Sequence, residues 1–363
     1  MTHLGSTAQT LAHSNKCEQL KRRNPFASPN VLRKSTMPKY GNVSAVPLSM
    51  AVFLACDTYD YNVDPHTISA TSLIKPLRQL VLSARVPTED AVVDLAQMVP
   101  SRMGSAIHDA IERAWTENHK TAMAVLGYPA KVIEKVLINP KNEDLFDGCI
   151  PIYLEQRAHR KVGKFTVSGK FDFVGDGRVE DFKSTSTYTA VNNTNDDKYI
   201  LQGSIYRWLN PTIVTKDEMA IQFIFTDWNR AKATNDPKYP QNRIQQRVLG
   251  LKSLPETNAF IERKLSQIEA YWEAPEEDLP LCSDEDLWRS EPVFKYYKNP
   301  EKTARSTKNF DTKQEAMLRY IEDGSKGIVK EVPGQVTACK YCTAFSVCSQ
   351  KDQLIKSGDL LMN

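Results

Sequence analysis

The 363-residue sequence lacks several features that mark specialised classes of protein. Its longest apolar run, 46–56, has 11 residues and is interrupted by Pro47 and Ser49, whereas a membrane span needs about 20. The run also follows a polar stretch and lies too deep in the chain for a signal peptide. With 15 Gly, 20 Pro and 41% hydrophobic residues, the composition excludes collagen, coiled coil and a wholly disordered chain. We expect a soluble, globular protein of the cytoplasm that does not contact a membrane.

Two further absences concern nucleotides and disulfides. No G-x-x-x-x-G-K-[ST] loop is present, which predicts no intrinsic ATPase, and the sequence has no internal repeat. Seven Cys without a secretion signal argue against a disulfide scaffold. Three of the cysteines are scattered, at Cys17, Cys56 and Cys149, whereas three others lie within ten residues.

Charge is distributed unevenly along the chain. Residues 1–45 contain seven Lys/Arg and one acid, a net charge of +6, and the remainder has a net charge of −3. This Ser/Asn/Pro-rich stretch has too few apolar residues to bury a core. It is interpreted either as a tether that adds affinity for nucleic acid or as a solvated tail.

The remaining pattern predicts a mixed α/β domain. After a turn at 62–65, apolar spacing predicts a helix over 68–85, capped by Ser72 with Pro76 in its first turn. Other predicted helices are 46–60, 104–126, 130–137, 198–209, 256–272 and 313–320. Predicted strands are 150–159, 165–174, 178–184, a central strand at 219–227, and 244–251 as its partner. The predicted organisation is a tail (1–45), a core (46–272) and a cysteine-bearing C-terminal segment (273–363).

The strongest chemical signal lies on two predicted strands. Asp172 ends one strand, and a Gly175-Asp-Gly177 turn leads into the next, which carries Asp181 and Lys183. Side chains alternate along a strand, so Asp181 and Lys183 share a face. Two carboxylates beside an ammonium suit Mg²⁺ or Mn²⁺ and phosphodiester hydrolysis. Asp and Lys also alternate on many solvated strands, so this signal is weak by itself.

Two helical pairs add to this signal. Gly104 and His108 are four residues apart, which places both on one helix face, where the small residue lets the helix approach the sheet. Gln202 and Tyr206 are also four apart and reach one cleft. A lone helical histidine such as His108 is more often a surface or packing residue, and a partly buried helix face also explains the Gln202–Tyr206 pair.

Together these motifs resemble the RecB-like branch of the PD-(D/E)XK nuclease superfamily. The family pattern is G-x-x-x-H, G-x-x-D, D-x-K and Q-x-x-x-Y, and this sequence has GSAIH, GKFD, DFK and QGSIY in that order. The resemblance covers residues 104–206 and implies a restriction-endonuclease-like core, a mixed central sheet flanked by helices.

The resemblance also implies a role for each matching residue. His108, Asp172, Asp181 and the Phe182 carbonyl would be metal ligands, and Glu155 is a secondary candidate. Lys183 would be the catalytic lysine, acting with Asp172 and Asp181. Gln202 and Tyr206 would contact DNA or order the site.

The cysteines fit the same branch. The spacing Cys339-x₂-Cys342-x₅-Cys348 resembles the C-terminal cluster ligands of AddB and the CRISPR-associated RecB-like exonucleases. Those proteins take a fourth Cys from an N-terminal segment corresponding to 72–79, which here contains none. Cys282, within an L-P-x-C…W segment similar to those of phage members, is the expected fourth ligand, with Cys56 in reserve.

The identity of the bound group stays open at this point. Four thiolates suit a 4Fe-4S cluster or a structural Zn²⁺, and the resemblance favours iron–sulfur. Either group would join the C-terminal segment to the core. The alternative is a set of unligated thiols.

The function that this implies is a metal-dependent DNA exonuclease of recombination, repair or phage DNA processing. A separate annealing protein or helicase is a possible partner, and the location would be the host cytoplasm if the gene is of phage origin. The alternatives are an endonuclease of the same superfamily and a catalytically idle DNA-binding or assembly module. Basic and aromatic residues alternate at 228–232 and 294–298, where either DNA contacts or solvated loops explain them.

Overall fold

The computed structural model describes residues 39–56, 64, 66–87 and 92–362. All of them belong to one compact unit, Met37–Asn363. Most of the basic tail with Cys17, and most of the predicted turn at 62–65, lie outside the described residues. Within the described part, no helix combines the length and apolarity of a membrane span.

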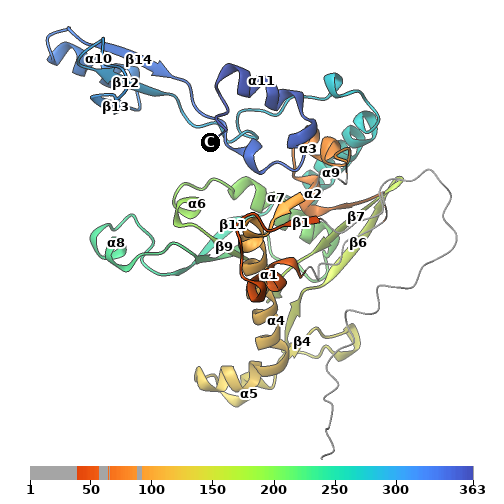
Figure 1. Ribbon diagram of the computed structural model, residues 1–363. Helices are drawn as coiled ribbons and strands as arrows, with labels where there is room; N and C mark the ends of the chain where they lie inside the picture. The colour runs from red at the N-terminus through yellow and green to blue at the C-terminus, as the bar shows by residue number, and fades with distance from the viewer. Residues whose placement is uncertain (1–38, 57–63, 65, 88–91, 363) are drawn as a thin grey trace, which may run out of the picture. The chain divides into compact units, whose positions relative to one another are not determined.

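A six-stranded mixed sheet forms the centre of this unit (Figure 1). Its strands are, in spatial order, β11 (Ile244–Gly250), β10 (Glu218–Phe225), β9 (Arg178–Thr185), β8 (Phe173–Gly175), β5 (Ile150–Leu154) and β4 (Val136–Ile138). β10 is parallel to β9 and antiparallel to β11. The predictions of a central strand near 219–227 and of its partner near 244–251 are therefore confirmed.

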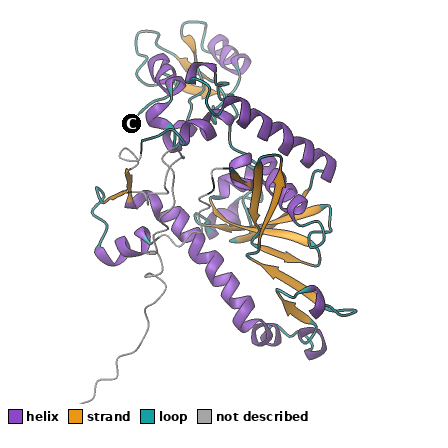
Figure 2. Ribbon diagram, turned by 90° about the vertical axis from the view of Figure 1, so that its right-hand side faces the viewer, coloured by secondary structure: helices purple, strands orange, loops and turns teal. Residues whose placement is uncertain are grey.

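Helices cover both faces of this sheet (Figure 2). On one face, Trp115 of the long helix α4 (Val99–Val125) packs against Phe173, which Phe182 also contacts. On the other, α7 (Asp196–Leu209) and α9 (Leu254–Tyr271) pack on the main core. Capping at Ser253 starts α9, where the Ser253 side chain and Glu256 exchange hydrogen bonds. The mixed α/β class is thus confirmed.

A second, three-stranded sheet continues from the first. It has the order β2-β7-β6, from β2 (Thr67–Ser69), β7 (Phe165–Lys170) and β6 (Arg157–Val162). The predicted strands 150–159 and 165–174 are each divided between the two sheets, so their prediction as single strands was wrong. The two stretches are divided side by side, since the Glu155 N–H at one division donates to the Asp172 carbonyl at the other (3.1 Å). Glu155 there has φ 50°, a left-handed conformation that is strained for a residue with a Cβ.

The turn that leads into β9 was predicted correctly. β8 and β9 are antiparallel with Gly175 opposite Arg178, which leaves Asp176 and Gly177 as the two turn residues. Their φ values are 50° and 73°. Two successive positive φ angles are typical of the tight type I′ hairpin, for which Asp-Gly is a preferred sequence.

Two predicted helices needed correction. The stretch 68–85 forms α2 (Ala70–Leu73) and α3 (Leu77–Ser83), separated at Pro76, which is the N-cap of α3. Proline cannot supply the amide hydrogen that would continue the helix, and the side chain that caps α2 is that of Ser69, not Ser72. The stretch 130–137 is helical only in α5 (Ala130–Ile133), before β4 begins.

The remaining elements surround these layers or follow them in the chain. Before the sheet lie β1 (Lys39–Gly41), α1 (Leu48–Ala55), β3 (Val92–Asp94) and the short 3₁₀ helix η3 (Leu95–Met98), and η4 (Asn142–Asp144) lies between β4 and β5. Between the later core elements lie α6 (Thr187–Val191) and α8 (Arg230–Asn235), and η5 (Glu276–Asp278) follows α9. The C-terminal elements are β12 (Val293–Tyr297), β13 (Lys308–Phe310), α10 (Lys313–Glu322), β14 (Ile328–Val332), η6 (Ala338–Tyr341), η7 (Phe345–Val347) and α11 (Ser349–Ser357).

Candidate metal centre

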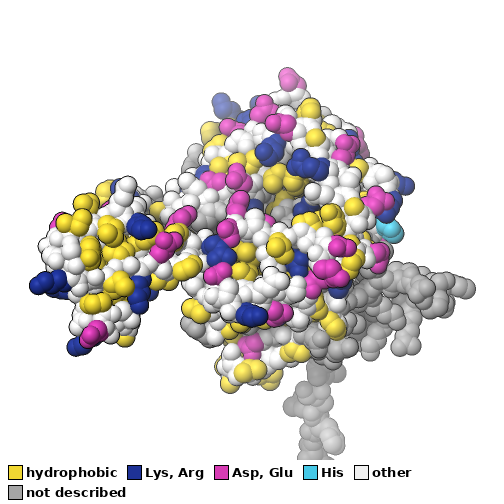
Figure 3. Space-filling model, turned by 90° about the horizontal axis from the view of Figure 1, so that it is seen from above, with side chains coloured by type: hydrophobic (Ala, Val, Ile, Leu, Met, Phe, Trp, Pro, Cys, Tyr) yellow, Lys and Arg dark blue, Asp and Glu magenta, His cyan; other side chains and the backbone are white. Residues whose placement is uncertain are grey.

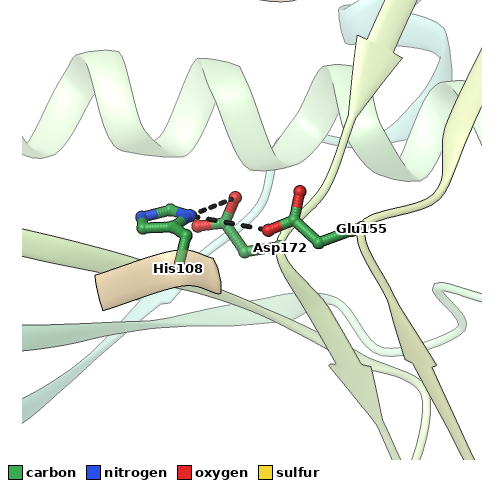
Figure 4. A group of neighbouring side chains, drawn as sticks. All are labelled: His108, Glu155 and Asp172. Atoms are coloured by element: carbon green, nitrogen blue, oxygen red, sulfur yellow. Dashed lines mark ion pairs between the residues drawn. The ribbon is translucent and has the colours of Figure 1, made fainter. Parts of the chain in front are cut away.

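Three side chains from separate elements converge where the strands pass between the sheets (Figure 4). His108 comes from α4, Glu155 follows β5, and Asp172 lies between β7 and β8. One ligand atom from each lies within 4.8 Å of the others, and among the described residues no other three His, Cys, Asp or Glu side chains meet in this way. One imidazole and two carboxylates are a donor set that suits a divalent cation.

His108 is held by both of its ring nitrogens. Nδ1 lies 3.6 Å from Glu155 Oε1 and 3.5 Å from Asp172 Oδ1. Nε2 lies 3.1 Å from the Phe182 carbonyl oxygen, to which it donates a hydrogen bond. The Phe182 amide in turn donates to Asp172 Oδ2 (3.0 Å). The Phe182 backbone therefore orients two of the candidate ligands, and its carbonyl, expected as a ligand, accepts from His108.

The charges of this group depend on burial. Burial opposes protonation of His108, but hydrogen bonds to Asp172 and Glu155 outweigh it and raise the pKa of the imidazole to about 10. Burial opposes ionisation of Asp172, but contact with His108 and the nearby Lys183 ammonium lower the pKa of that carboxyl. Two carboxylates thus face one imidazolium, and a cation bound there would displace the proton on Nδ1.

Asp181 and Lys183 form a second pair beside this group. Their side chains contact each other, and Asp181 is 1% exposed. Burial raises the pKa of Asp181 to about 6, although Lys183 opposes part of the rise. Burial lowers the pKa of Lys183, but Asp181 and Asp172 reverse this, so that the net shift is upward and the ammonium stays charged. Asp181, expected as a metal ligand, is not a member of the three-residue donor group.

The helical pair on α7 reaches Asp181. Gln202 Nε2 donates to Asp181 Oδ1 (3.3 Å) and to the Tyr206 hydroxyl (2.8 Å). Both side chains are buried. The contacts connect α7 to Asp181, and the expectation that the pair contacts DNA or orders the site stays a prediction. Gly104 faces Ser184 of β9, where an added Cβ would lie 3.7 Å from Ser184 Oγ, an ordinary contact.

A cavity of about 430 Å³ opens beside the donor group. The acidic side chains lie in its wall together with hydroxyl and cationic groups, among them Ser69, Thr71, Arg102, Ser105, Arg157 and Lys170. Lys170 pairs with Glu155, and Arg157 Nη1 donates to Ser168 Oγ (3.3 Å). The cavity therefore offers both metal ligands and groups that can bind phosphate oxygens.

The sequence interpretation missed these cationic residues. For Lys170 a signal was present, because side chains alternate along a strand and Lys170 is two residues from Asp172. For Arg102 the signal was weaker: its guanidinium is buried, and Nε donates to the Leu54 carbonyl of α1 (3.0 Å). That contact joins residues 48 positions apart, which no local pattern predicts.

The structure brings four of the cysteines into one neighbourhood. Cys282 interacts electrostatically with Cys342 and Cys348, and Cys339 with the same two. Burial raises the pKa of the Cys282 thiol to about 12 and that of Cys339 to about 11. Among the described residues no three of these sulfur atoms lie within 4.8 Å of one another. Cys56 directly follows α1 and is exposed, and Cys149 precedes β5.

Helix α3 lies against this neighbourhood. Arg78, 3% exposed, donates from Nε to Cys348 Sγ (3.5 Å) and from Nη1 to the Leu279 carbonyl (3.1 Å). Its guanidinium also pairs with Glu276. Residues 72–79, the segment that contains no cysteine to serve as a fourth ligand, therefore reach Cys348 through an arginine.

Comparison with known proteins gives distant likenesses. No protein-family model and no curated protein matches the chain. Among solved structures, the crystal structure of SSO0001 is similar with a TM-score of 0.37 and 14% identity, covering 62% of this chain and 86% of that one. A phage-related exonuclease from Haemophilus somnus 129PT is similar with a TM-score of 0.22 and 18% identity, covering 33% of this chain and 60% of that one. Likenesses this distant carry no argument about function, so the function is inferred from the residues of the site.

Proposed function

We propose that the chain is a metal-dependent deoxyribonuclease that hydrolyses phosphodiester bonds, with exonuclease action as its principal activity. The observation that supports this most is the convergence of His108, Glu155 and Asp172, with the Asp181–Lys183 pair beside them. These five residues come from a helix, the ends of strands and an adjacent strand, so their meeting is not a product of local sequence.

The donor set fits Mg²⁺ or Mn²⁺. Two carboxylates supply hard oxygen ligands, and His108 presents Nδ1 to them while Nε2 is held by the Phe182 carbonyl. When bound, such a cation lowers the pKa of a water molecule and neutralises charge on a phosphate oxygen. Asp181 stands next to the set, where Gln202 orients its carboxylate.

Lys183 supplies positive charge to the reaction. Its raised pKa keeps the ammonium protonated, so it is suited to stabilising charge that develops on the phosphate and not to accepting a proton from water. During hydrolysis a water oxygen bonds to phosphorus, the P–O bond to the leaving sugar oxygen breaks, and a proton is lost from the water and gained by that oxygen, which leaves as a hydroxyl group. Arg157 and the hydroxyl groups of the cavity can hold the phosphate oxygens during this exchange.

The four cysteines are proposed to bind a structural 4Fe-4S cluster, with Zn²⁺ as the alternative. Their mutual electrostatic contacts and the burial of Cys339 support this, as does the absence of a disulfide among the described cysteines. Bound metal would stabilise the thiolates of Cys282, Cys339 and Cys342, whose pKa values are otherwise raised by burial.

A cleavage assay tests the nuclease proposal. End-labelled linear duplex DNA and nicked circular DNA are incubated with the protein in Mg²⁺, Mn²⁺ or EDTA, beside a Lys183→Ala variant. We expect metal-dependent loss of linear DNA, and a rate at least about 100-fold lower in the variant, because a charge-stabilising group is removed. Lys216→Ala is the matched control, since Lys216 pairs with Asp176 in an exposed turn.

Other outcomes of the cleavage assay would contradict this proposal or support one of its alternatives. Cleavage of circles would establish the endonuclease. Binding without cleavage by folded, metal-loaded protein would establish an idle DNA-binding module. Equal activity of the Lys183→Ala and Lys216→Ala variants would exclude Lys183 from the reaction.

A further inference from the structure

The chain between Cys282 and Cys339 folds into a small sheet of its own. Strands β12, β13 and β14 are antiparallel in the order β13-β12-β14, and α10 packs on them. Tyr296 is fully buried between sheet and helix, and its hydroxyl donates to Asp323 Oδ2 (3.0 Å) at the end of α10. Met317, Leu318 and Ile321 of α10 are exposed, and Figure 3 shows hydrophobic side chains on the surface of this small unit.

The β12–β13 hairpin carries an unbalanced positive charge. Residues 295–308 contain five basic residues and one acid, Glu301. No ion pair joins any of the five to another residue in the described part of the chain. The basic residues are Lys295, Lys298, Lys302, Arg305 and Lys308, of which all but Lys295 are exposed.

A sixth positive charge, that of Lys330, lies beside the hairpin because of the register of the sheet. Lys295 of β12 is directly opposite Lys330 of β14, and Asn309 of β13 is opposite Lys295 on its other side. Side chains alternate, so this row lies on the face opposite Tyr296 and α10. Like charges directly opposite each other destabilise a sheet, and the row contains no acid to offset them. An anion bound across the row would remove that repulsion.

The composition of the hairpin favours nucleic acid over a membrane. Between Lys298 and Lys308 the residues are small or polar, with no large apolar side chain that would insert into lipid. Hydroxyl and amide groups, such as those of Thr307 and Asn309, lie among the cations and can donate to phosphate oxygens.

We infer that the β12–β13 hairpin, together with Lys330, binds the phosphate backbone of a nucleic acid without regard to its sequence. The inference rests on the proposed nuclease function for the identity of the nucleic acid as substrate. The hairpin would hold DNA by charge, separately from the groups that cleave it.

Binding is measured apart from cleavage. A fluorescein-labelled duplex oligonucleotide is titrated with the Lys183→Ala protein in Mg²⁺ at several NaCl concentrations. Two double variants are made in this background, Lys295→Gln/Lys330→Gln and Lys302→Gln/Arg305→Gln. The matched control, Lys313→Gln/Lys326→Gln, removes two exposed charges at the start of α10 and beyond its end.

We expect each hairpin double variant to bind about 10-fold more weakly at 0.1 M NaCl, and its slope of log affinity against log salt to fall by about 2, one for each lost phosphate contact. The control should bind as the Lys183→Ala parent does. Lys295→Arg/Lys330→Arg should also bind normally, because it keeps the charge.

Three results would overturn the inference. They are unchanged DNA binding by both hairpin variants, equal weakening by the control, and, in a parallel titration with phosphatidylserine vesicles, loss of vesicle binding by hairpin variants that still bind DNA. Failure of the nuclease proposal is separable, since a wild-type protein that cleaves no DNA would leave a hairpin-dependent affinity in place.

Discussion

At the scale of single residues, Glu155 combines a chemical role with a strained backbone. Its carboxylate contacts His108 and Lys170, and its φ of 50° lies in the left-handed region. That conformation costs a residue with a Cβ about 1–2 kcal/mol relative to the ordinary right-handed one. The strain persists where two strands pass between sheets, which is typical of positions at which geometry serves a site.

A pair of substitutions separates the two properties of Glu155. Glu155→Ala and Glu155→Gly both remove the carboxylate, so both should weaken Mn²⁺ binding by at least about 10-fold in titration calorimetry. Glycine adopts positive φ without a Cβ clash, so the Gly variant should be more stable than the Ala variant by about 1 kcal/mol in thermal unfolding.

The neighbouring residue supplies the control for this test. Gln156 is not among the residues with positive φ. There the order should reverse, with Gln156→Ala more stable than Gln156→Gly. An Ala variant at 155 that is as stable as the Gly variant would show that the backbone at this position is not strained.

At the scale of elements, α3 and the segment around η5 are joined through Arg78 and Glu276. Glu276 accepts from the Ser349 amide at the start of α11 and from the Ser349 hydroxyl (2.8 Å), besides pairing with Arg78. Burial opposes ionisation of Glu276, but the Ser349 bonds and Arg78 outweigh it and lower the pKa of the carboxyl. One carboxylate therefore connects three segments.

This connection predicts a pH-dependent stability. Because the folded-state pKa of Glu276 is below the unfolded value, its stabilisation is complete above the unfolded pKa, about 4.3, and is lost as pH falls through the folded pKa. Glu276→Gln should lower the unfolding free energy by about 1–3 kcal/mol at pH 7, and the difference from wild type should vanish at the lowest pH that keeps the fold. Thermal unfolding between pH 7 and pH 3 measures this. A difference independent of pH would assign the effect to packing, and Glu277→Gln, one residue along, is the control.

The same scale shows what local sequence can and cannot predict. The shared face of Asp181 and Lys183 followed from the alternation along a strand, which covalent geometry imposes, and the Asp-Gly hairpin followed from its turn residues. The division at Glu155 was not predictable, since neither Gly nor Pro marks it and the long-range pairing with Asp172 decides it. Pro76 did signal a break in the sequence, but the helical spacing of Leu77 and Leu80 outweighed it, and a single helix was predicted.

At the scale of the whole molecule, the cysteines join distant parts of the chain. Cys282 lies 57 positions before Cys339, and the β12–β14 sheet with α10 occupies the interval. Gln350, just after Cys348, exchanges two hydrogen bonds of 2.9 Å with the backbone of Cys282. The ends of this long loop are therefore already adjacent, and a metal held by the four thiolates would close the loop covalently.

Closure of that loop gives the last prediction. We expect purified wild-type protein to hold iron and sulfide, or else Zn²⁺, and Cys282→Ser to lose most of it, since a ligand is removed and the unfolded chain gains the freedom of the open loop. Elemental analysis and visible absorbance identify the bound group. The rate of limited proteolysis between residues 283 and 338 measures how far the loop has loosened in the variant. Cys149→Ser, which changes a thiol before β5, should retain the metal. Full metal content in Cys282→Ser would exclude this residue as the fourth ligand, and it would leave the adjacency of Cys282 and Gln350 to hydrogen bonding alone.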